Sequence, residues 1–217
     1  GVDRGGALTF VVGGALVAAA WFGAALVPSG TGVAVVTVLP EGLGVLALLV
    51  ATRLRQHRAA IAALVLIGGH LGLRLLDPGS AELSAVLLLV ALNLVLLSPL
   101  ADRGLGQPRA LLHLLLVVAQ PGVLWLALGP LARLRETAAP PAALSAVPWA
   151  VAVAGLALVV VAVVRRGPIE AALLWGLVAA GAAVLGAGPE LRHSALFDAA
   201  QATLLVALVE QGYRLAF

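Results

Sequence analysis

The chain has 217 residues, of which 62% are hydrophobic and only 11% are charged. An average soluble domain carries about 25% charged residues, so this composition excludes an ordinary soluble enzyme and a disordered tail. All basic residues other than His are Arg, and the net charge of +3 is too small for a nucleic-acid-binding surface. Cys and Lys are absent, which excludes disulfides, thiolate chemistry and a lysine Schiff base. The composition therefore indicates a polytopic membrane protein.

Charged residues, Pro and Gly divide the chain into eight apolar runs. Each run has about the 20 residues that a helix needs to cross a bilayer. The runs lie near residues 7–27, 33–52, 59–76, 82–100, 109–129, 143–164, 168–187 and 194–214. None of them alternates as a strand does, and Ala and Leu dominate. We expect an all-α, polytopic transmembrane helix bundle of about eight spanning helices.

The distribution of Arg between the connecting segments predicts the orientation of the bundle. With the N-terminus inside, the cytoplasmic segments carry nine Arg residues and the opposite segments carry four. The strongest cluster is Arg53, Arg55 and Arg58, between the second and third runs. Because cytoplasmic segments of membrane proteins are enriched in Lys and Arg, both the N- and C-termini are expected to be cytoplasmic.

Six polar residues are predicted at bilayer depth, where such side chains are costly and are either functional or paired. They come from four of the runs and fall in the outer half of the bilayer when depth is counted along each helix. These residues are Glu41, His70, Arg74, Asn93, Asp198 and Gln201. Matched depths predict two pairs, Glu41 with His70 and Arg74 with Asp198. The pairs either hold the helices together or line a ligand pocket open to the periplasm, and a helix break at Pro40 favours the pocket.

A b-type haem is another interpretation of the buried histidines, because such haems are held by histidines inside helix bundles. The candidate ligands are His70, His113, His193 and His57. His70 and His113 differ in predicted height by about 12 Å, so they do not suit one haem. His70 with His193, or His57 with His113, fits better in depth.

Three further features complete the sequence predictions. Gly68 and Gly72 have the spacing of small residues that let two helices approach closely.

Glu170 begins the seventh run and is expected to cap that helix rather than to belong to a site. The chain contains no nucleophile elbow, no His-Glu-x-x-His motif and no phosphate-binding loop. We therefore do not expect this chain to be an enzyme by itself.

The last run becomes amphipathic toward the end of the chain. Its final segment, Glu210–Phe217 (Glu-Gln-Gly-Tyr-Arg-Leu-Ala-Phe), resembles the stretch before the GGDEF domain of multi-pass bacterial diguanylate cyclases. Leu92–Leu97 followed by Asp102–Leu105, and the basic turn Arg53–Arg58, also resemble the membrane regions of those proteins. The GGDEF motif itself does not occur in this sequence.

The resemblance implies a sensor in the bacterial inner membrane. Residues 1–209 would form the transmembrane sensor bundle, and residues 210–217 would begin a connector to a cytoplasmic GGDEF domain that makes cyclic di-GMP. A homodimer is expected, in which a shift of the last helix changes how two cyclase domains meet. The signal would be a ligand at the polar pocket or a redox change at a haem. Two other classes stay open, a small transporter and a haem-binding electron carrier.

Overall fold

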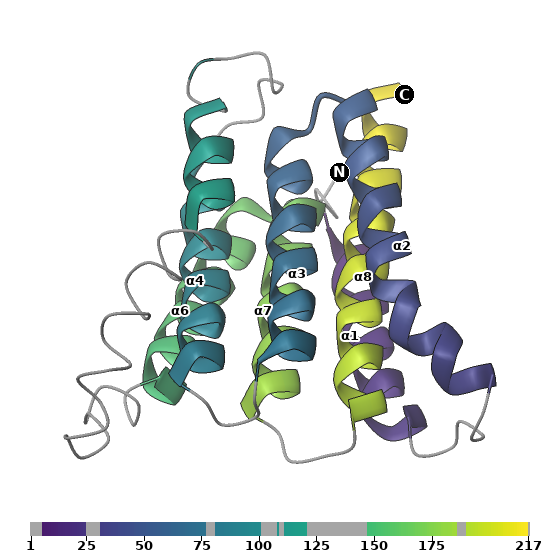
Figure 1. Ribbon diagram of the computed structural model, residues 1–217. Helices are drawn as coiled ribbons and strands as arrows, with labels where there is room; N and C mark the ends of the chain where they lie inside the picture. Colours follow the sequence, from purple (N-terminus) through teal and green to yellow (C-terminus); the bar gives the residue numbers. More distant parts are fainter. Residues whose placement is uncertain are drawn as a thin grey trace.

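The computed structural model describes residues 6–24, 31–76, 81–100, 108, 111–120, 147–185 and 190–216. Figure 1 shows the helices that they form. The labelled helices are α1 (Ala7–Gly23), α2 (Thr31–Arg53), α3 (His57–Leu75), α4 (Ala81–Leu97), α6 (Val147–Arg165), α7 (Pro168–Leu185) and α8 (Glu190–Ala216). Leu111–Gln120 forms a further, shorter helix. The described ranges contain no strand, so the predicted all-α class is confirmed.

Three helices, α3, α6 and α7, are long and apolar enough to cross a membrane. α1 is also apolar but shorter. α6 exposes most of its apolar side chains, and Trp149 and Val164 are each 75% exposed. An apolar helix with so little protein around it suits contact with acyl chains. These helices indicate a membrane protein whose helices can insert in a bilayer. Of the predicted fifth run, residues 109–110 and 121–129 lie outside the described part.

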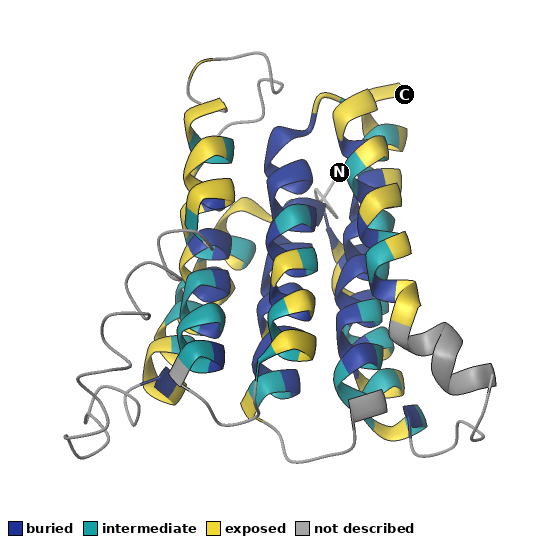
Figure 2. Cartoon of the chain, viewed as in Figure 1, coloured by how far each residue is buried: buried dark blue, intermediate teal, exposed yellow. Residues whose placement is uncertain are grey.

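α7 and α8 form the centre of the bundle. α8 packs against α1, α2, α3 and α7, and α7 also contacts α1, α3, α4 and α6. α7 is buried along most of its length, whereas the outer helices are exposed on one side (Figure 2). α1 to α4 alternate in direction, as do α6 to α8, and the start of α3 and the last turn of α8 lie at one end (Figure 1). We call this end the Arg58 end, and the other, with the start of α8, the His70 end.

Two glycines of α3 allow close helix contacts. A Cβ at Gly69 would lie 3.0 Å from a methyl group of Val90, and a Cβ at Gly72 would lie 2.9 Å from one of Val86. Gly68 faces open space instead. The prediction that Gly68 packs together with Gly72 is therefore wrong. Residues three apart in the sequence lie on the same face of a helix, as residues four apart do. Here Gly69, three residues before Gly72, provides the second close contact with α4.

Candidate functional site

A polar cluster lies near the His70 end, between α2, α3 and α8. The His70 side chain is fully buried, with Nδ1 3.1 Å from Glu41 Oε1 and Nε2 3.3 Å from Ser194 Oγ. Because an ionised carboxylate can only accept, Nδ1–H donates to Glu41, and Nε2 of the neutral ring accepts from the Ser194 hydroxyl. Arg74 donates to the same Glu41 oxygen at 3.1 Å. The predicted Glu41–His70 pair is thus present, and Ser194 connects it to α8.

Asp198 and Gln201 continue this cluster along α8. Gln201 is 1% exposed, and its Nε2 donates to the Ala63 carbonyl at 3.2 Å. The Asp198 carboxyl interacts electrostatically with Glu41. Three buried oxygens of this cluster have no hydrogen-bond partner among the described residues: Glu41 Oε2, Asp198 Oδ1 and Gln201 Oε1. We refer to the following residues as the His70 cluster: Glu41, His70, Arg74, Ser194, Asp198 and Gln201.

The predicted pairing of Arg74 with Asp198 is wrong. Arg74 lies one turn beyond His70 on α3, on the same face. From there it reaches Glu41, which already faces α3 through its contact with His70. Matched depth could not choose between two carboxylates at neighbouring heights.

Asn93 does not join the His70 cluster as predicted. It lies four residues before Leu97, about 6 Å from the end of α4, whereas His70 lies about 20 Å from the start of α3. Asn93 therefore belongs to the half of the bundle near the Arg58 end. Its Nδ2 donates to Gln120 Oε1 at 2.6 Å, and Gln120 Nε2 donates back to Asn93 Oδ1 at 3.1 Å. This reciprocal amide pair joins α4 to the helix Leu111–Gln120.

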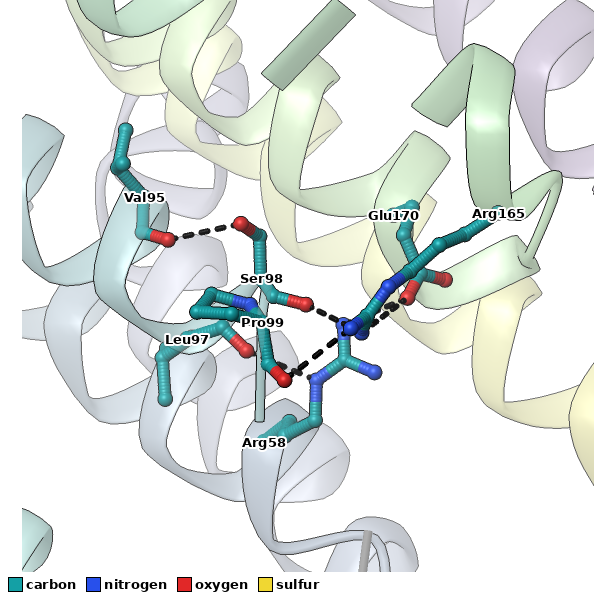
Figure 3. Close-up of polar contacts among 7 residues, drawn as sticks. All are labelled: Arg58, Val95, Leu97, Ser98, Pro99, Arg165 and Glu170. Atoms are coloured by element: carbon teal, nitrogen blue, oxygen red, sulfur yellow. Dashed lines mark hydrogen bonds and ion pairs between the residues drawn. The ribbon is translucent and has the colours of Figure 1, made fainter. Parts of the chain in front are cut away.

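A buried ion pair lies at the Arg58 end. Arg58 Nη2 lies 2.8 Å from Glu170 Oε1, and Arg58 Nε donates to the Leu97 carbonyl at 3.0 Å (Figure 3). The two charged side chains are 6% and 7% exposed. Glu170 was predicted only as a cap for its own helix. The structure shows that it also holds α7 against α3 through its ion pair with Arg58.

Arg165, at the end of α6, extends this ion pair to a third helix. Its Nη1 lies 3.8 Å from Glu170 Oε1 and donates to the Ser98 carbonyl at 2.7 Å, and its Nη2 donates to the Pro99 carbonyl at 3.1 Å (Figure 3). Carbonyls just after a helix end have no intrahelical donor, so a guanidinium there satisfies two of them. Arg58, Glu170 and Arg165 together fix α3, α4, α6 and α7 to one another.

Glu210, near the end of α8, binds the start of α1. Its Oε1 accepts from the Gly6 N–H at 3.0 Å, and its Oε2 accepts from the N–H and the hydroxyl of Thr9 at 3.1 and 2.6 Å. Arg214 donates to Oε1 at 3.0 Å. A carboxylate here satisfies first-turn amides and complements the helix dipole. We call these four residues the Glu210 clamp. The predicted boundary between residues 209 and 210 falls inside α8, with Glu210 attached to the bundle.

The histidines do not suit a haem at His70. Both ring nitrogens of His70 already have partners, and the Phe197 ring lies 5.4 Å from the imidazole, centroid to centroid. His57 is buried at the start of α3, and His193 is half-buried near the start of α8, at the other end of the bundle. His113 is half-buried in Leu111–Gln120. Within the described ranges, no three His, Cys, Asp or Glu residues are grouped to hold a metal ion. The contacts of His70 therefore argue against a haem ligand at that position.

Comparison with known proteins does not place the chain in a family. No protein-family model matches it, and no curated protein or solved structure is significantly similar. Function has to be inferred from the polar clusters and from the helices that connect them.

Proposed function

We propose that this chain is the transmembrane input domain of a bacterial signalling protein, with eight spans in the inner membrane and both termini in the cytoplasm. The arginine bias supports this orientation. The ends of α2, α6 and α8 and the start of α3, which meet at the Arg58 end, carry Arg53, Arg58, Arg165 and Arg214. The His70 cluster would then lie in the half of the bundle that faces the periplasm.

The observation that carries the proposal is that α8 joins the His70 cluster to the start of α1. Ser194 and Asp198 lie in the first turns of α8, and Glu210 lies near its end. The helix is continuous from Glu190 to Ala216, and about 24 Å of helix separates Ser194 from Glu210. A shift or rotation of α8 that changes the Ser194–His70 contact therefore also acts on the Glu210 clamp.

The Glu210 clamp can exist in two arrangements. In the one described, the Glu210 carboxylate accepts three hydrogen bonds from Gly6 and Thr9. In the other, these bonds are broken and the end of α8 moves away from α1. A ligand changes the ratio of the two arrangements only by binding them with different affinities. A charged ligand at the His70 cluster would do so, because it competes with the contacts that Glu41 makes to His70 and Arg74.

The output domain of this proposal is a cytoplasmic GGDEF-type diguanylate cyclase connected to the end of α8. Its support is the resemblance of Glu210–Phe217 and Arg53–Arg58 to the membrane regions of such proteins. Two chains would form a homodimer, and a shift of both α8 helices would change how their cyclase domains meet. The input domain itself contributes no catalytic residue.

A distance measurement tests the relay, and it is specific because the chain has no Cys. Spin labels on Leu8→Cys and Leu215→Cys, at positions that are 58% and 65% exposed, report the separation of α1 from the end of α8. The full chain in nanodiscs should show one narrow distance population. Glu41→Gln should add a longer one, because it weakens the contacts that hold α8 through His70. Ser98→Ala, which removes a hydroxyl bonded only within α4, is the matched control.

The variant Glu210→Gln separates the two halves of this relay. If E41Q and E210Q both add the longer distance and S98A does not, the coupling between the His70 cluster and the Glu210 clamp is supported. If E210Q lengthens the distance and E41Q leaves it unchanged, the clamp can open but is independent of the His70 cluster. That result would contradict the proposed function.

A further inference from the structure

The His70 cluster has more hydrogen-bond acceptors than donors. Glu41 Oε2, Asp198 Oδ1 and Gln201 Oε1 are buried and have no partner among the described residues. The hydrogen bonds that His70, Arg74 and Gln201 donate go to Glu41 Oε1 and to the Ala63 carbonyl, so none of them reaches these three oxygens. Buried acceptors without a donor are unfavourable, so this arrangement favours any group that brings N–H or O–H donors.

The cluster also contains more carboxyl groups than cationic side chains. Glu41 and Asp198 supply two carboxylates, and Arg74 supplies one guanidinium, which lies on Glu41. His70 is neutral in the arrangement in which Nε2 accepts from Ser194. The nearby Arg192 stacks its guanidinium over the Trp21 ring at 4.9 Å. A ligand with a single positive charge would stabilise the ionised form of both carboxyl groups.

Gln201 places the third free acceptor between α2, α3 and α8. Its side chain is 1% exposed and is held by the bond from Nε2 to the Ala63 carbonyl of α3. Nε2 also lies next to Gly44 of α2, where a Cβ would approach it to 2.9 Å. Gly44 is one turn from Glu41, and Gln201 is one turn from Asp198, so the three free oxygens belong to neighbouring turns of facing helices. Gln201 thus provides a buried neutral acceptor beside the two carboxylates.

We propose that the His70 cluster binds the ammonium group of a small primary amine. This inference rests on the proposed function, in which the cluster is the receiving site, and it specifies the ligand. A primary ammonium carries one positive charge and three N–H donors, which equals the number of free acceptors. Among the described residues no group of three His, Cys, Asp or Glu suits a metal ion, which argues against a metal cation. The amine enters from the rim of the cluster, where the side chains of Glu41 and Arg74 are 25% and 47% exposed.

Thermal unfolding of the full chain in nanodiscs tests the site with methylammonium chloride as the probe. A ligand that binds the folded state raises the unfolding temperature in proportion to its occupancy. Methylammonium should raise it saturably, whereas tetramethylammonium, which has the same charge but no N–H donor, and sodium should not. Asp198→Asn should weaken the apparent affinity for methylammonium at least about tenfold, as expected for loss of a charged hydrogen-bond partner.

Two further variants complete the design. Gln201→Met keeps the side-chain volume and both carboxyl groups but removes the neutral acceptor, so it should also weaken the binding of methylammonium. This variant replaces D198N in the test if D198N does not fold. Ser98→Ala removes a hydroxyl that is bonded only to the Val95 carbonyl, far from the His70 cluster, and should leave the affinity unchanged. Equal shifts with all three salts, a shift with sodium alone, or full affinity in both D198N and Q201M would overturn the proposal.

The two proposals fail in different measurements. If methylammonium binds and needs Asp198 but never changes the Leu8–Leu215 distance, the site is correct and the relay is wrong. If E41Q changes that distance while methylammonium does not bind, the relay is supported and the ligand is wrong.

Discussion

Replacement of Arg58 by Met should strongly destabilise the bundle. In R58M, Glu170 keeps its carboxylate at 7% exposure but loses its partner at 2.8 Å, and the Leu97 carbonyl loses its donor. Removing one member of a buried ion pair costs about 3–5 kcal/mol, and an unpaired buried carbonyl adds about 1 kcal/mol. Arg165 remains 3.8 Å from Glu170 and could partly stabilise the unpaired carboxylate. Because the Arg165 side chain is 42% exposed, solvent screens this attraction and makes it weak. We expect a loss of about 4–5 kcal/mol in the free energy of unfolding.

The double variant R58M/E170L separates the cost of an unpaired charge from the loss of the pair itself. It leaves no buried charge, so it should be more stable than R58M by about 1–3 kcal/mol. The assay is unfolding of the full chain by SDS in mixed micelles, followed by helical circular dichroism. Arg165→Gln is the control and should cost less, because that side chain is partly solvated. A loss below about 1 kcal/mol in R58M, or a double variant no more stable than R58M, would refute this reasoning.

Three further predictions use the same assay. Glu210→Ala should cost about 1–2 kcal/mol, because the first turn of α1 loses its capping carboxylate, and an unchanged stability would contradict that role. Single replacement of Asn93 or Gln120 by Leu should cost about 0.5–2 kcal/mol, because one buried amide then stays unpaired. The double replacement should cost less than the sum of the two, because neither amide remains. Strictly additive costs would contradict the hydrogen-bonded amide pair. Gly69→Ala should cost about 1 kcal/mol through overpacking, whereas Gly68→Ala should be neutral or stabilising; the reverse order would disprove the assignment of the packing face.

The sequence was sufficient for features that depend on one helix or on depth alone. Apolar runs predicted the helices, because no other structure satisfies the backbone inside a bilayer. The meeting of Glu41 with His70 followed from two polar side chains at the same predicted height on consecutive runs. Depth counting works for this pair because consecutive antiparallel helices are neighbours in the bundle.

The remaining contacts depend on which helices become neighbours, and depth does not contain that information. Gly6 and Glu210 are 204 residues apart, and they meet only because α1 packs beside α8. Arg58 and Glu170 each lie in the first turn of a helix, so both could be explained locally, as an orientation signal and as a cap. The sequence does contain a feature from which this pair could have been predicted. Arg58 and Glu170 carry opposite charges and are both expected at the same end of the bundle, where a charged side chain that becomes buried needs a partner.

The orientation of α8 in the membrane is the claim on which the relay depends, and thiol accessibility tests it directly. Leu215→Cys and Phe22→Cys lie at opposite ends of the bundle and are 65% and 73% exposed in the parent chain. In right-side-out membrane vesicles, a membrane-impermeant maleimide should label F22C at once and L215C only after the vesicles are lysed. Labelling of L215C in intact vesicles would place the end of α8 outside the cytoplasm and contradict the account.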